Sequence, residues 1–147
     1  MSVSRTRARR LALQGLYEWQ MSDNAPAEIV ARLKQSKEAQ GMDAEYFQEL
    51  MHQVPAQVEQ LDKQLQIFMG RELSESDGVE RAVLRLGAYE LTARLDIPYR
   101  VAINEAVELA KRYGGEQGHK FVNGILDKLA AEVRVVEISA RTRKKTS

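Results

Sequence analysis

The sequence contains no cysteine, which excludes a disulfide framework and a metal site built from thiolates. It also has no apolar run that approaches the roughly 20 residues of a membrane-spanning helix. The N-terminus leads directly into arginines and lacks the apolar segment of a secretory signal peptide. These absences predict a cytoplasmic protein that does not enter a membrane.

The residue patterns of common catalytic and cofactor sites are missing as well. The two histidines, His52 and His119, lie in different halves of the chain, and neither has the spacing of a metal-binding motif. There is no G-x-S-x-G motif and no P-loop, and the glycine-rich run at residues 114–118 lacks the lysine and the preceding strand of a phosphate-binding loop. We therefore expect a protein that is not an enzyme and that uses no cofactor or metal ion.

Acidic residues are absent from both ends of the chain. Residues 1–10 and 141–147 together hold eight of the 22 basic side chains and none of the 21 acidic ones, which leaves residues 11–140 with a formal charge of −7. Basic ends on an acidic middle indicate a polyanionic partner that is bound at defined places. Residues 141–147 have no apolar side chain, so we expect this basic tail to be disordered.

Apolar side chains recur at spacings of three and four residues along most of the chain, which predicts an all-α fold of about six to seven helices. The periodicity is interrupted at residues 70–78, so we expect a linker there between an N-terminal half, about 4–70, and a C-terminal half, about 76–140. Apolar residues on two sides of the segment 79–95 predict a central helix. Residues 133–138 fit either a short strand or a last helical turn.

Glycine, proline and small polar residues indicate where the helices begin and end. Pro26 fits the first turn of a helix, and the polar residues at 22–24 can cap it. That helix is expected to end near Gly41, and Asp43 is expected to cap the next one. Pro55 removes a backbone donor inside this third segment, so we expect a kink or a break there.

The first predicted helix carries a polar face beside its apolar one. The polar face consists of Arg7, Arg10, Gln14 and Tyr17. A guanidinium group donates two parallel hydrogen bonds to phosphate oxygens, whereas an amide or an aromatic ring can meet the bases. The face is therefore a candidate nucleic-acid site, although a solvated terminus explains the same arginines.

A second candidate site lies at the start of the last predicted helix, in the run from Gly118 to Phe121. A helix N-terminus offers unpaired backbone donors to a phosphate, and Lys120 adds a positive charge. Phe121 is one residue out of phase with the buried stripe, so its ring can stack on an unpaired base. The alternative is a ring that is tucked under the preceding loop.

Four segments of the sequence resemble the NusB family of bacterial transcription antitermination factors. They are SRTRARRLALQGLYEWQ at 4–20, VERAVLRLGAYEL at 79–91, IPYRVAINEAVELAKRYG at 97–114 and HKFVNGILDKL at 119–129. The resemblance implies two small helical bundles packed on each other. It also implies binding to the single-stranded boxA element of nascent RNA, mainly ribosomal RNA, together with NusE, a small-subunit ribosomal protein, in an antitermination complex on RNA polymerase.

The resemblance also assigns roles to residues. The implied RNA-binding surface combines the two candidate sites and consists of Arg5, Arg7, Arg9, Arg10, Gln14, Gln117, Lys120 and Phe121. Tyr17 and Glu80 correspond to contacts with NusE. Some relatives are dimers, so a homodimer is a further expectation.

Three other interpretations remain open on the sequence. A helical interaction or dimerisation module with no RNA role would use Tyr17, Glu80 and the exposed helix faces. A piece of an RNA methyltransferase with a NusB-like domain is disfavoured, because a glycine-rich cofactor loop is missing. A DNA-binding helix-turn-helix is disfavoured by the acidic middle, because a recognition helix needs basic flanks.

Overall fold

The computed structural model describes residues 2–146, and all regular structure in this part of the chain is helical. The bounds are α1 Val3–Met21, α2 Pro26–Leu33, η1 Lys37–Ala39, α3 Ala44–Ala56, α4 Val58–Gln66, η2 Leu73–Glu75, α5 Gly78–Ala93, α6 Tyr99–Tyr113, α7 Gly118–Val133 and α8 Val135–Thr146, where η marks a 3₁₀ helix. The predicted all-α fold is confirmed, with slightly more helices than expected. Within residues 2–146, none of the helices combines the length and the apolar character that a bilayer-spanning segment requires.

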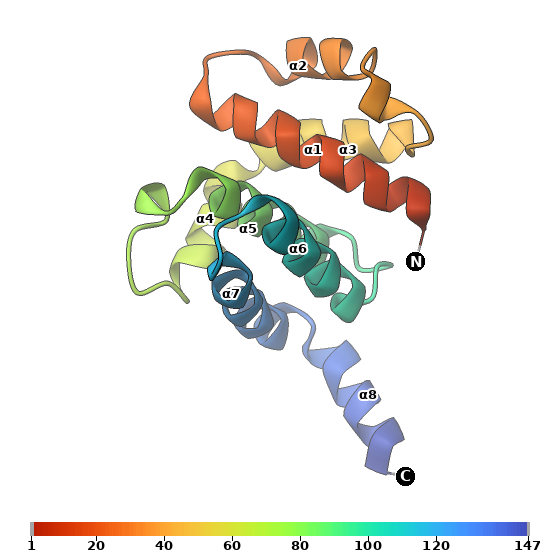
Figure 1. Cartoon of the computed structure of the whole chain (residues 1–147). Helices are drawn as coiled ribbons and strands as arrows, with labels where there is room; N and C mark the ends of the chain where they lie inside the picture. The colour runs from red at the N-terminus through yellow and green to blue at the C-terminus, as the bar shows by residue number, and fades with distance from the viewer. Residues whose placement is uncertain (1, 147) are drawn as a thin grey trace.

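The helices form two bundles that meet where α1 packs against α5 (Figure 1). The first bundle contains α1, α2 and α3; the second contains α4 to α7, and α8 extends away from it (Figure 1). Because α4 packs against α5 and α7, the division between the bundles falls near Gln57 and not at the linker predicted for residues 70–78. Leu73 of η2 is buried, so that segment is held in place beside α4 rather than forming a free linker.

The third predicted segment breaks two residues after Pro55. α3 continues through Pro55 to Ala56, and Gln57 then leaves the helical conformation with φ −107° and ψ 13°. Proline lacks an N–H group and its ring crowds the carbonyl one turn earlier, so the segment splits into α3 and α4. The break directs the chain from the first bundle into the second.

The predicted helix cap is present at the start of α3 but not at the start of α2. Asp43 caps α3 as predicted, since its carboxylate accepts a hydrogen bond from the N–H of Tyr46 at 3.0 Å. The polar residues before α2 do not cap it. Its N-cap is Ala25, and the hydroxyl of Ser22 donates back to the carbonyl of Glu18 in α1. Ser22 therefore closes the end of α1 instead of opening α2.

Two helix ends differ from the expectation. α2 ends at Leu33, well before Gly41, and η1 lies between them. The structure has a helix from Val135 to Thr146, which includes most of the tail that was expected to be disordered, and Ser147 lies outside the described residues. Lysine, arginine and alanine all favour helix, and they extend the turn that begins at Val135.

α5 is the central helix, as predicted, with residues of both apolar faces buried. Its C-terminal carbonyl groups are capped by Arg134, a buried residue between α7 and α8. All five N–H groups of this guanidinium donate hydrogen bonds of 2.6 to 3.1 Å. The acceptors are the backbone carbonyls of Glu90, Leu91, Arg94 and Ile97 and the carboxylate of Glu137. Arg134 thus fixes the start of α8 to the end of α5.

Candidate nucleic-acid interface

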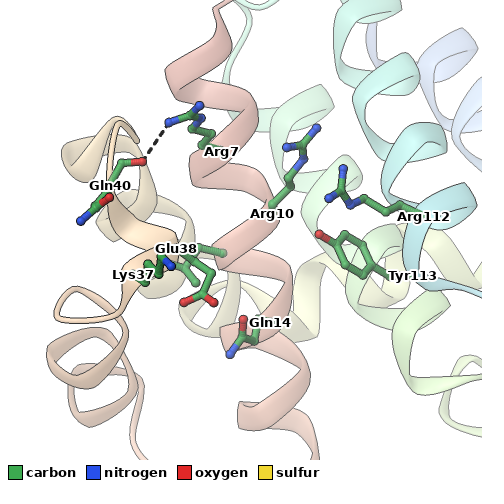
Figure 2. Close-up of a pocket in the computed structure, with 9 residues that line it drawn as sticks. Arg7, Arg10, Gln14, Lys37, Glu38, Gln40, Arg112 and Tyr113 are labelled. Carbon is green, nitrogen blue, oxygen red and sulfur yellow. Dashed lines mark hydrogen bonds between the residues drawn. The ribbon is translucent and has the colours of Figure 1, made fainter.

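A groove lies between α1, η1 and the end of α6, and side chains from all three segments line it (Figure 2). Its volume is about 340 Å³. The lining side chains are Arg7, Arg10, Leu11, Gln14, Lys37, Glu38, Gln40, Arg112 and Tyr113. Four of them are basic and one is acidic, so the groove attracts anions.

Three of the basic side chains in this groove have no acidic partner among the residues that the structure describes. Arg10, Lys37 and Arg112 are exposed and make no ion pair within 4.0 Å to any residue of the described part of the chain. Arg7 donates from its Nη1 atom to the carbonyl oxygen of Gln40 at 3.0 Å (Figure 2). That bond orients the guanidinium of Arg7 without neutralising it, so all four cations can still attract an anion.

A second hollow continues the groove along α1 toward the start of α5. It is lined by Arg10, Leu13, Gln14, Tyr17, Val79 and Tyr113. Tyr17 and Tyr113 are 40% and 46% exposed, so two aromatic rings face solvent here. Because Arg10 and Gln14 line both hollows, the cationic groove and the aromatic hollow form one surface.

The surface reaches the start of α7 through two close contacts at glycines. Tyr17 packs on Gly78, where an added Cβ atom would lie 2.9 Å from the tyrosine ring. Glu80 packs on Gly118 in the same way, and an added Cβ atom would lie 2.6 Å from its carboxylate oxygen. The two candidate sites, on α1 and at the start of α7, are therefore linked through the start of α5.

Phe121 lies at the edge of the core, as predicted, but another side chain covers its ring. The guanidinium of Arg71 lies over the ring, 5.0 Å from its centroid. Lys120 and Gln117 are exposed, and Gln117 occupies the N-cap position of α7 without a side-chain cap bond. Burial raises the pKa of Glu80, an effect that the nearby charge of Arg71 opposes. Arg71 therefore belongs to this end of the surface.

Two of the eight predicted RNA-binding residues lie away from the surface. Arg9 is only 2% exposed, and its guanidinium pairs with Glu90 at 2.8 Å and Glu105 at 3.2 Å. It cannot reach a ligand, so its assignment is corrected to a structural role, in which it joins α1 to α5 and α6. Arg5 turns to the other side of α1, where it pairs with Asp43 at 3.8 Å.

The network around Arg9 lies in the core where the two bundles meet. The carboxylate of Glu90 is fully buried and accepts hydrogen bonds from Arg9 and from the hydroxyl of Tyr46. Its second oxygen has no hydrogen-bond partner within the described part of the chain. Burial raises the pKa of Glu90, and the positive charge of Arg9 opposes this rise. The hydroxyl of Thr6 donates to Glu105 at 2.7 Å and completes the network.

Four basic or aromatic side chains of the surface were not predicted from the sequence: Lys37, Arg71, Arg112 and Tyr113. A signal existed for the last two, because a cation and an aromatic ring stand directly before two glycines at a helix end. Lys37 and Arg71 gave no local signal. Their places depend on how η1 and the turn after α4 fold back against α1 and α7.

Comparison with known proteins identifies the relatives of this chain. The family model described as "NusB family" matches residues 6–131. The chain belongs to the NusB family. Transcription antitermination protein NusB of Marinomonas sp. (strain MWYL1) is 51% identical over 142 residues, which are 95% of this chain and 82% of the relative. The protein of the same name from Acinetobacter baylyi (strain ATCC 33305 / BD413 / ADP1) is 52% identical over 135 residues, 92% of this chain and 91% of the relative.

Solved structures of NusB proteins share the fold. T. maritima NusB is 33% identical with a TM-score of 0.78, and the match covers 90% of this chain and 94% of that one. The chain in a crystal structure of antitermination factors NusB and NusE in complex with dsRNA is 29% identical with a TM-score of 0.80, covering 90% of this chain and 99% of that one. The curated NusB relatives are transcription antitermination proteins, so the expectation that this protein is not an enzyme is confirmed. The family match ends before Arg134, so α8 and its anchor lie beyond it.

Proposed function

We propose that this NusB-family protein binds the single-stranded boxA element of nascent ribosomal transcripts, together with NusE, as a cytoplasmic subunit of an antitermination complex on RNA polymerase. The observation that carries this proposal is the groove between α1, η1 and α6, where three unpaired cations stand beside an exposed aromatic ring. Unpaired cations suit phosphates, and aromatic rings suit the unstacked bases of a single strand. The solved NusB–NusE–dsRNA complex supports RNA and NusE as the classes of partner.

The proposed RNA path follows the surface from α1 to the start of α7. Arg7 and Arg10 contact phosphates, and Gln14 meets a base edge. At the other end Gln117, Lys120 and Phe121 contact the strand. Gln117 is neutral, so it repels a phosphate less than an acidic side chain would. Arg5 and Arg9 are left out of this contact set, because one pairs with Asp43 and the other is buried.

We place NusE on the face around Tyr17 and Glu80, next to the RNA path. Tyr17 and Met21, one turn apart on α1, are both exposed, and both lie beside Gly78. An apolar patch with a carboxylate at its edge is suited to a protein rather than to RNA. A second copy of the chain could occupy the same face. Light scattering separates the two occupants: a homodimer that persists when NusE is added, and that RNA does not affect, would favour the interaction-module alternative.

The test of RNA binding is a filter-binding titration with single-stranded boxA RNA, with and without NusE. Arg7→Ala combined with Arg10→Ala should weaken binding and flatten its dependence on salt by up to about 1.4 in slope, since each phosphate neutralised on a single strand contributes about 0.7. Arg100→Ala is the matched control, because Arg100 is exposed at the opposite end of α6, roughly 18 Å from Arg112 along the helix. Unchanged affinity in the double variant would contradict the proposal.

A further inference from the structure

The geometry points to Arg10 and Arg112 as a clamp for one phosphodiester group of the bound strand, in a groove that Lys37 also lines; this inference rests on the proposed RNA-binding function. Figure 2 shows the two guanidinium groups side by side at one opening, Arg10 from α1 and Arg112 from α6. Because these helices belong to different bundles, the clamp lies across the junction of the two bundles.

Arg10 and Arg112 line two hollows together. Both line the groove with Lys37, and both line a neighbouring hollow of about 250 Å³ between α1 and α6. Two guanidinium groups in the same place repel each other unless an anion lies between them. The planar guanidinium donates two parallel hydrogen bonds to a phosphate, so a pair of them can hold one phosphate by several oxygens.

The carboxylates of the neighbouring hollow are already engaged, and Glu38, which lines the groove itself, makes no ion pair with either arginine in the described part of the chain. Glu105, which lines the neighbouring hollow, accepts from Thr6 and pairs with Arg9. Glu108, in the same hollow, pairs with Lys111 at 3.5 Å. Neither lies within ion-pair distance of Arg10 or Arg112 in the described part of the chain. An anion from outside the protein is therefore the partner that this pair of charges lacks.

A nucleotide strand fits this site better than an isolated phosphate. Tyr113 follows Arg112 directly, is 46% exposed and lines the same groove, with the guanidinium of Arg112 5.5 Å from its ring centroid. Stacking of a base on an aromatic ring strengthens the binding of single strands. A phosphate held by the clamp would leave the attached base next to this ring. The groove also continues past Tyr113 into the hollow beside Gln14, which leaves room for the strand to extend.

The experiment uses the full chain and single-stranded boxA RNA at about 50 and 200 mM salt, where phosphate contacts dominate the salt dependence. Arg112→Ala should weaken binding roughly tenfold, equivalent to about 1.4 kcal/mol, but should leave most of the salt slope, because Arg10 still neutralises the phosphate. Only the loss of both arginines should reduce the slope by about 0.7. Arg112→Lys keeps the charge and the slope but loses the planar fork, so it should recover only part of the affinity. Arg10→Ala with Arg112→Ala should cost less than the product of the single effects, because both arginines hold one phosphate.

The outcomes separate the clamp from the proposed function. If Arg112→Ala binds like the Arg100→Ala control while Phe121→Ala weakens binding, RNA binding stands and the clamp is overturned. If the two single effects simply multiply, the arginines serve different phosphates and the clamp is also overturned. If the wild-type chain does not bind the RNA at all, the proposed function fails and the clamp fails with it.

Discussion

Replacing Arg9 and replacing Arg10 by methionine should have opposite consequences, although the two residues are adjacent. Arg9 is buried, with its side chain 3% exposed, and it pairs with Glu90 and Glu105. Removing one partner of a buried ion pair costs about 3–5 kcal/mol, because the remaining charge is left unpaired. Arg10 is exposed and has no ion pair in the described part of the chain, so Arg10→Met should change the free energy of unfolding by less than about 0.5 kcal/mol.

Urea unfolding followed by circular dichroism measures the loss of stability expected for Arg9→Met. RNA titration measures the loss of RNA affinity expected for Arg10→Met. With a slope of roughly 2 kcal/mol per molar urea, Arg9→Met should lower the unfolding midpoint by about 2 M. The folded variant should still bind RNA nearly as tightly as the wild type. Arg10→Met should show the reverse pattern. A stable Arg9→Met variant with weak RNA binding would refute the assignment of Arg9 to the core and of Arg10 to the RNA surface.

The effect of Arg9→Met should also depend on pH. The pKa of Glu90 is raised in the folded state above its usual value of 4.5, so its contribution is most favourable below that value and is lost as the pH rises through the folded-state pKa. Arg9 opposes this rise, so its removal raises the pKa of Glu90 further. The deficit in stability should therefore be larger at about pH 8 than at about pH 5, where Glu90 is more often protonated. An equal deficit at both pH values would contradict this explanation.

Three further predictions follow from contacts elsewhere in the molecule. Arg134→Met should lower the free energy of unfolding by at least about 3 kcal/mol, because it leaves buried carbonyls at the end of α5 unpaired, and urea unfolding measures it. Phe121→Ala should weaken RNA binding about fivefold or more without changing the salt slope, since stacking releases no counterions; a changed slope in filter binding would exclude the stacking role. Gly87→Ala should destabilise by about 1–3 kcal/mol, because the new Cβ atom would lie 2.7 Å from a methyl group of Leu126. Gly124→Ala, with no atom within 4 Å of the new Cβ, is its control and should unfold at the same or a higher urea concentration.

Features set by local periodicity were predictable from the sequence. The two apolar faces of α5 follow directly from the spacing of its side chains, and α5 does lie at the centre of the fold, packed against α1, α4, α6 and α7. The face that contains Arg7, Arg10, Gln14 and Tyr17 was also predictable, because residues three and four apart share one side of a helix. The structure places all four on one surface.

Features set by tertiary packing were not predictable in this way. From the sequence, Arg9 was predicted to bind RNA like the neighbouring arginines. It is buried instead, because it pairs with Glu90 on α5, a helix far along the chain. A hint was available, because Glu90 falls among apolar residues of the central helix and a buried carboxylate requires a cation nearby. The position of the break after Pro55 depends in the same way on α4, whose residues Leu61 and Leu65 are buried in the second bundle.

The central claim is that RNA lies along one face, from the groove beside α1 to the start of α7. Photo-crosslinking of the wild-type chain to a boxA RNA with 4-thiouridine at each uridine in turn, followed by mass spectrometry of the linked peptides, tests it most directly. We expect crosslinks to peptides that contain Tyr113 or Phe121. Crosslinks confined to α2 or to α8 would place the strand elsewhere and contradict it.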